Sequence, residues 1–331
     1  MSQKTNKQTV QQTNKKTNKK TNNQTNNKKK NNKNNNKNNN RNNKNNNTSK
    51  KKKQQTSKTL TTNFPYVDTH CHLEMILKKL KITHTDKTYE EIKNKLEFPE
   101  GFEGMLIIGC EPETFTEVHS FLNFETDEIR LSFGVHPHNA KDYTNRLEKK
   151  IIKYSKLDKV VAVGEIGLDY HYMHSPKHTQ QEVFIKQIKI AVSLDKPIVL
   201  HSREAEEDTL RIMKEHVPQE HLIHLHCFTS SNTFLRQMLD HFPNLYVGFT
   251  GIITFKGKSC DPIREAVKIV PLDRILSETD GPFMGPVPFR GKVAHPGRIP
   301  WIINKIAELK EIEKEEAYSQ IRQNAKTIYK F

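Results

Sequence analysis

The stretch YVDTHCH at residues 66–72 decides the fold of this chain. It is a short apolar run that leads into two histidines, His70 and His72, with Cys71 between them. Alternate side chains of a strand point to the same face, so the two imidazoles lie together while the thiol turns away. A buried strand that ends in polar residues is typical of parallel α/β proteins, which build their active sites at the carboxyl ends of their strands.

Four further segments repeat this pattern of an apolar run that ends in His, Asp or Glu. They are VAVGE at 161–165, IVLH at 198–201, LIHLH at 222–226 and RILSETD at 274–280. Their terminal polar residues are Glu165, His201, His226 and Asp280. His224 shares a face with His226 but lies deeper in its strand, and we interpret it as structural. The repetition predicts one polar site assembled from several strand ends.

The order of the segments predicts a closed (β/α)8 barrel of the TIM type. Strands are predicted near 66–71, 104–109, 130–135, 160–164, 197–200, 222–226, 244–249 and 274–279. Apolar residues at helical spacing predict helices at 178–194, 300–309 and 313–329. Residues 73–103 are long for one connection and indicate an inserted helical excursion. A doubly wound sheet is the alternative, but polar residues spread from the first strand to the last favour closure.

The amino-terminal segment has a different composition from the rest of the chain. Residues 1–60 hold 18 of the 54 Lys and Arg residues and no acid, which leaves 36 basic against 38 acidic residues in the remainder. The formal charge of +16 therefore belongs to this segment alone. Asn, Lys, Thr and Gln cannot bury enough apolar surface to offset chain entropy, so residues 1–62 are predicted to be a disordered tail. Residues 63–331 have the usual size of one barrel domain.

The tail has two interpretations. It is either a Lys-rich arm that holds nucleic acid through phosphate contacts, or a solvated extension without a dedicated partner. No apolar segment is long enough to span a membrane, and none resembles a secretory signal. We therefore expect a cytoplasmic protein, with a nuclear location suggested only by the basic run at 50–53.

The set of polar residues suits a pair of divalent cations. His70 and His72 repel each other if both are protonated, and a cation resolves that conflict by taking neutral nitrogens as ligands. Glu165 and Asp280 supply anionic oxygens, and a carboxylate between two ions can bridge them. The remaining strand-end histidines would complete a second site, which suits Zn²⁺, Mn²⁺ or Mg²⁺.

These motifs resemble the TatD family of metal-dependent deoxyribonucleases, which lies within the larger class of amidohydrolase-like barrels. The resemblance rests on DTHCHL at 68–73, GEIGLDY at 164–170, LHSREA at 200–205, HCFT at 226–229 and ETDGP at 278–282. It implies one ion held by His70, His72, Glu165 and Asp280, and another held by Glu165, His201 and His226. It also implies hydrolysis of DNA phosphodiester bonds, often from the 3′ end.

Four other residues are candidates for binding substrate. His136 and His138, in GVHPH at 134–138, are either phosphate contacts or a solvent-exposed pair in a turn. Arg203 offers a fork of donors to a phosphate, or else forms a surface ion pair. Arg290 lies in PVPFRGK at 286–292, which also resembles the family. Beyond it the family commonly has Arg-Asn-Glu-Pro where this chain has VAHP at 293–296, so the substrate preference stays open.

The chemistry that follows is hydrolysis by water activated between two ions. Asp280, assisted by Glu165, is the candidate catalytic residue that orients this water and takes its proton. The favoured function is a divalent-metal-dependent deoxyribonuclease, a 3′–5′ exonuclease. The alternatives are a barrel hydrolase acting on a small amide, lactone or phosphoester, and a non-catalytic nucleic-acid binder tethered by its tail.

Overall fold

All eight strands are parallel, and they pair in chain order. The computed structural model describes residues 63–85 and 87–331, so the predicted tail at 1–62 lies outside the described residues. The strands are β1 Tyr66–Cys71, β2 Phe102–Gly109, β3 Ile129–Phe133, β4 Val160–Asp169, β5 Ile198–Arg203, β6 Ile223–Leu225, β7 Leu245–Phe249 and β8 Ile275–Ser277. Every strand predicted from the sequence is present.

The first and last strands join at their carboxyl ends. Cys71 and Gly281 form a parallel bridge, and the amide of His72 donates to the Gly281 carbonyl at 2.8 Å. The amide of Asp280 donates to the His70 carbonyl at 3.0 Å. These bonds span more than two hundred residues of chain and bring the two ends of the sheet together there. The barrel prediction is confirmed, and the doubly wound alternative is wrong.

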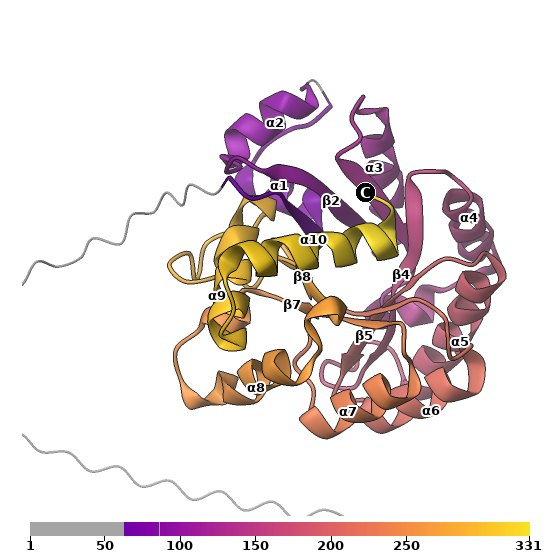
Figure 1. The fold of residues 1–331 in the computed structure, drawn as a ribbon. Coiled ribbons are helices and arrows are strands. Elements are labelled where there is room, and N and C mark those ends of the chain that lie inside the picture. The colour runs from indigo at the N-terminus through magenta and orange to yellow at the C-terminus, as the bar shows by residue number, and fades with distance from the viewer. Residues whose placement is uncertain (1–62, 86) are drawn as a thin grey trace, which may run out of the picture. The chain divides into compact units, whose positions relative to one another are not determined.

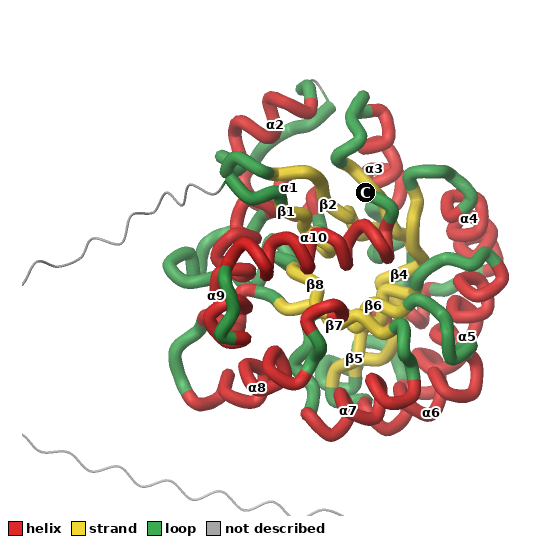
Figure 2. The backbone as a smooth tube through the Cα atoms, viewed as in Figure 1, coloured by secondary structure: helices red, strands yellow, loops and turns green. Residues whose placement is uncertain are grey.

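Helices surround the strands (Figures 1 and 2). They are α1 Leu73–Leu80, α2 Tyr89–Leu96, α3 Phe115–Ser120, α4 Asn145–Ser155, α5 Lys177–Ser193, α6 Glu206–His216, α7 Asn232–His241, α8 Asp261–Ile269, α9 Ile299–Lys310 and α10 Lys314–Tyr329. The three helices predicted from apolar spacing are α5, α9 and α10. The insertion at 73–103 carries α1 and α2 as expected.

The carboxyl-terminal helix α10 closes the amino end of the barrel. Figure 1 shows it lying across the strands. Its residues Ala325, Ile328 and Tyr329 are buried and belong to the apolar cluster that fills the barrel interior. The strand residues of that cluster include Val67, Leu106, Ile108, Val161, Val199 and Leu276. The opposite end of the barrel is left for polar residues.

Strands β4 and β5 extend further than the sequence predicted. The fourth strand was expected to end at 164, but it continues to Asp169, and β5 continues to Arg203. The register shifts between Gly164 and Ile166, which face Val199 and Leu200, so Glu165 is an extra residue in β4. A bulge of this kind lets pairing resume while it redirects one side chain. Glu165 therefore lies within a strand and not after its end.

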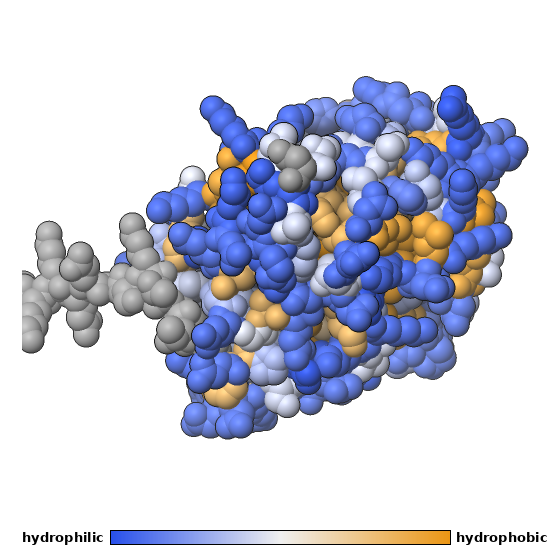
Figure 3. Space-filling model, turned by 90° about the horizontal axis from the view of Figure 1, so that it is seen from above, coloured by the Kyte–Doolittle hydropathy of each residue, from blue (hydrophilic) through white to orange (hydrophobic). Residues whose placement is uncertain are grey.

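The face seen in Figure 3 is mostly hydrophilic, with hydrophobic side chains visible in patches between charged ones. Within the described residues, every helix is too short or too polar to cross a lipid bilayer.

Candidate metal centre

Glu165 stands at the centre of a ring of histidines. Its bulged position in β4 directs the carboxylate toward the carboxyl ends of the other strands. The imidazole nitrogens nearest to this carboxylate belong to His201 at 2.7 Å, His226 at 2.9 Å, His70 and His136 at 3.5 Å, and His72 at 3.9 Å. One buried carboxylate thus contacts imidazoles from β1, β5 and the segments that follow β1, β3 and β6.

Asp280 completes the site from the opposite side of the barrel. Its Oδ1 lies 3.9 Å from Nε2 of His70 and 3.6 Å from Nε2 of His72. The residue follows β8 with a φ of 48°, a left-handed conformation that Asp tolerates better than most residues. Because the Asp280 amide donates to the His70 carbonyl, the junction between the end of β1 and the end of β8, the barrel seam, holds this carboxylate beside the histidine pair.

The donor set fits divalent cations. His70, His72 and Glu165 offer ligand atoms within 4.8 Å of one another, and so do His136, Glu165 and His201. Both ring nitrogens of His70 and Nδ1 of His72 are buried without a hydrogen-bond partner. Buried polar atoms are normally satisfied, because leaving them without a partner costs free energy. Nitrogen and carboxylate donors converging in this way suit Zn²⁺ or Mn²⁺.

The protonation of the site differs from one histidine to the next. Burial lowers the pKa of both His70 and His136 to about 4, which keeps these rings neutral. Burial also disfavours the charged form of His72, but nearby carboxylates, Asp280 foremost, outweigh it and raise that pKa to about 9. At Glu165 burial favours the neutral form, yet the surrounding imidazoles hold its pKa well below the usual range. Without bound ions the site thus combines two neutral rings, His70 and His136, with a His72 ring whose charged form is favoured and with an ionised central carboxylate.

Glu278 is a functional candidate that the sequence analysis did not single out. Its Oε1 accepts a hydrogen bond from the Cys227 amide and lies 3.5 Å from Nδ1 of His226, while its Oε2 lies 2.9 Å from Nε2 of His224. Glu278 therefore orients His226 from behind, as carboxylates often do for metal-binding histidines. The signal was available, because Glu278 precedes Asp280 by two residues, the spacing of one strand face.

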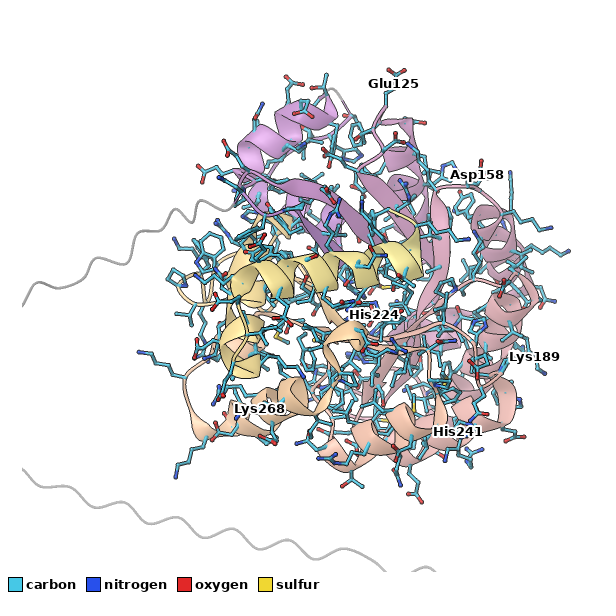
Figure 4. The ribbon with its side chains drawn as sticks, in the orientation of Figure 1. Glu125, Asp158, Lys189, His224, His241 and Lys268 are labelled. Carbon is cyan, nitrogen blue, oxygen red and sulfur yellow. The ribbon has the colours of Figure 1, made fainter. Side chains whose placement is uncertain are left out.

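His224 connects Glu278 to the amino end of the barrel. Its Nδ1 lies 2.6 Å from the hydroxyl of Tyr329 in α10. Figure 4 shows His224 in the middle of the barrel beside α10, far from labelled residues on the outer helices such as Lys189 and His241. The structural role expected for His224 is consistent with this burial and these two partners.

Two more carboxylates support the site. Asp169, at the end of β4, places Oδ2 3.0 Å from Nε2 of His138 and 3.3 Å from Nε2 of His201. Asp68 is fully buried in β1 and accepts hydrogen bonds from the Thr279 amide and hydroxyl. Burial raises the pKa of Asp68 to about 8. Both residues share the strand face of a predicted ligand, so a strict period of two could have found them.

A cavity of about 430 Å³ opens onto the site, and three of the four residues predicted to bind substrate line it. It is lined by His136, His138 and Arg203, together with Glu165, Asp280 and other residues. The Arg203 guanidinium lies 4.7 Å from the ring centroid of Tyr172 and has no carboxylate partner among the described residues. Arg290 does not line this cavity. It lines a neighbouring one.

A family model described as "TatD related DNase" matches residues 67–330, nearly the whole of the barrel. The chain belongs to the TatD family. The resemblance inferred from the motifs is thus confirmed.

Curated members of the TatD family are similar in sequence to this chain over most of its length. The chain is 38% identical over 268 residues to the human protein named "3'-5' RNA nuclease TATDN2", and the match covers 80% of this chain but 35% of the human protein. It is 38% identical over 263 residues to the "Uncharacterized metal-dependent hydrolase YabD" of Bacillus subtilis, with 80% and 98% covered. The chain is accordingly a metal-dependent hydrolase of the TatD family.

Solved structures of TatD relatives show the same fold. The TatD homologue YjjV of Escherichia coli superposes with a TM-score of 0.68 at 24% identity, covering 80% of this chain and 98% of that one. A TatD family hydrolase from Entamoeba histolytica gives a TM-score of 0.67 at 22% identity, covering 81% and 99%. At such identities the likeness concerns the barrel alone.

Proposed function

We propose that this protein is a 3′–5′ exonuclease that hydrolyses phosphodiester bonds of DNA with two divalent ions. One observation carries the proposal: in a chain of the TatD family, Glu165 lies among five histidines at the floor of an open cavity. Arg203 lies on the cavity wall, has no carboxylate partner among the residues that the structure describes, and suits a phosphate. Residues 63–331 form the catalytic domain in this proposal, and residues 1–62 are an appendage.

Each residue of the site has a chemical role in this proposal. His70, His72, Glu165 and Asp280 hold one ion, and Glu165, His201 and His226 hold the other, with His136 placed to join them. Bound divalent ions supply a water of lowered pKa and neutralise charge on the phosphoryl oxygens. The Asp280 carboxylate orients the attacking water and accepts its proton.

RNA is the second candidate substrate. The names of two relatives favour it, the human "3'-5' RNA nuclease TATDN2" and the "3'-5' ssDNA/RNA exonuclease TatD" of Erwinia tasmaniensis. The Erwinia protein is 30% identical over 233 residues, which cover 69% of this chain and 89% of that protein. A hydrolase of small amides, lactones or phosphoesters is the alternative from another class.

Metal content tests the ligand assignment. Elemental analysis of the purified full-length chain is expected to find about two divalent ions, since a shared Glu165 serves both donor sets. His72→Ala and His226→Ala are each expected to lose one ion. His241→Ala is the matched control, because this histidine lies at the end of α7 on the outside of the barrel (Figure 4). A metal-free wild type whose activity survives EDTA would overturn the assignment.

Digestion of end-labelled strands tests the reaction. Single-stranded DNA labelled at the 5′ end is expected to give a ladder that shortens one nucleotide at a time, and EDTA is expected to abolish it. RNA of the same sequence decides between the two nucleic acids through the ratio of kcat/KM values. A panel of amides, lactones and phosphotriesters is the control. Faster turnover of any of these than of both nucleic acids would replace the nuclease proposal.

A further inference from the structure

A second cavity lies directly beside the metal centre. It measures about 530 Å³, within the range of ligand sites in proteins. Phe283 and Met284 line both this cavity and that of the metal centre, so the two cavities are neighbours that share these side chains as a wall. Neither the predicted ions nor the hydrolysed bond requires this space. We call it the side cavity.

The side cavity is positively charged. Its wall carries Lys79 from α1 and Arg290 and Lys292 from the segment after β8, and no Asp or Glu lines it. Among the residues that the structure describes, none of these three cations has a carboxylate within salt-bridge distance. By contrast Arg264 and Arg322 on the outer helices are paired with Asp261 and Glu103. Three unneutralised cations in one hollow attract an anion.

Aromatic rings lie between these cations. The Lys79 ammonium is 4.6 Å from the centroid of the Phe283 ring, and the Arg290 guanidinium is 4.6 Å from that of Phe255. Phe283 is 44% exposed, although a large apolar side chain is usually covered. An exposed ring beside cations is the combination with which proteins bind single strands, because bases stack on the ring and phosphates meet the charges.

We propose that the side cavity binds the nucleotide of a single-stranded substrate next to the one being cleaved. Phe283 stacks the base, and Lys79, Arg290 and Lys292 hold the adjoining phosphate. This inference rests on the proposed nuclease function and gives it a second subsite. It also gives Arg290 a position, one nucleotide away from the metal centre. The amino-terminal segment, rich in Lys and without acids, is excluded as the occupant by its charge.

The length of the single-stranded substrate distinguishes binding in the side cavity from binding at the metal centre. The test compares Lys292→Ala in the full-length protein with Lys189→Ala, an identical change of charge on the exposed face of α5 (Figure 4). For a long single strand, Lys292→Ala is expected to raise KM about fivefold more than Lys189→Ala does, with kcat little changed. The excess is expected to be smaller for a dinucleotide, which has a single phosphate to share. Equal KM values for the two variants on the long strand would overturn the subsite.

The salt dependence of DNA affinity reports how many phosphate contacts the protein makes. Binding of single-stranded DNA is measured in EDTA for the wild type and for the variant Lys79→Ala/Arg290→Ala/Lys292→Ala. Because the amino-terminal segment is the same in both proteins, the difference between them reports on the side cavity. The slope of log affinity against log salt is expected to fall by up to about 2 for three lost cations. An unchanged slope in a variant with wild-type thermal stability would overturn the proposal.

Phe283→Leu tests the stacking of the base. It keeps an apolar side chain at the wall and is expected to weaken binding of the single strand about tenfold. Val287→Ala removes another exposed apolar group from the same segment and is the control. Wild-type affinity in Phe283→Leu would overturn base stacking. Failure of the nuclease proposal itself looks different, because no protein, wild type included, would then cleave nucleic acid.

Discussion

The two ends of the barrel differ in composition and in role, although the same eight strands form both. The amino end is filled by apolar side chains and covered by α10, whose Ile328 and Tyr329 are buried. The carboxyl end holds buried imidazoles and carboxylates around an open cavity. Stability and chemistry are therefore assigned to different ends, as is usual in TIM barrels. The buried path Glu278–His224–Tyr329 is a direct link between them.

The largest effect is expected at the carboxyl end. Asp280→Asn keeps the size of the side chain but removes the charge needed to accept a proton. We expect kcat to fall at least about 10²-fold, the lower range for a lost general base, with near-normal folding and partly retained metal. Asp158→Asn is the matched control, since this exposed residue lies at the amino end. Wild-type turnover in Asp280→Asn would move the proton acceptor elsewhere, with His136 next.

A stability effect without a chemical one is expected at the amino end. Ile328→Ala leaves a void between α10 and the barrel interior, and the free energy of unfolding is expected to fall by about 2–5 kcal/mol. Well below the melting temperature, kcat and metal content are expected to match the wild type. Thermal melting and single-turnover assays on the same sample check both parts. A loss of kcat without a loss of stability would contradict the division between the two ends.

An intermediate effect is expected on the path between the ends. Tyr329→Phe removes the hydroxyl that contacts Nδ1 of His224 and leaves that nitrogen buried without its partner. We expect metal affinity to fall by up to about tenfold through Glu278 and His226, and the free energy of unfolding to fall by about 1–3 kcal/mol. Tyr318→Phe is the control, because it removes a hydroxyl from the same helix that donates to the Pro300 carbonyl and does not contact His224. If both variants gave the same metal affinity, the contact between Tyr329 and His224 would have no effect on the metal centre, and the predicted link between the two ends would be wrong.

The smallest effect on the folded domain is expected from removing residues 1–60. They hold the excess positive charge of the chain, so affinity for long DNA at low salt is expected to fall and the difference to vanish as salt rises. The melting temperature and turnover of short strands are expected to stay the same. A large drop in melting temperature would show that this segment packs against the barrel.

The sequence predicted the barrel because each strand can be recognised from its own residues. Each apolar run had a length suited to a strand, and the proposed metal ligands His70, His72, His201, His226 and Asp280 marked the strand ends. It predicted the end of β4 less well. The bulge at Glu165 depends on how β4 pairs with β5, and register between distant strands is not written in local composition.

The residues that support the site were harder to identify than the proposed metal ligands. Glu278 and Asp169 lay inside quoted motifs, but their roles depend on which nitrogen of which histidine faces them, a property of side-chain packing. Arg290 was placed with the substrate residues by its motif, whereas the cavity that it lines arises from α1, the Phe255 segment and the loop after β8. No local pattern links segments so far apart in the chain.

The seam of the barrel has a consequence for how the protein is made. The bonds that join β1 to the end of β8, from His72 to Gly281 and from Asp280 to His70, lie within the metal centre itself. A ribosome that has released only the first seven strands has produced neither a ring nor a complete site, because both await the same residues. Chains cut short before Asp280 lack both these bonds and one proposed metal ligand, so we expect activity to appear only once the last strand has been made and the barrel has closed.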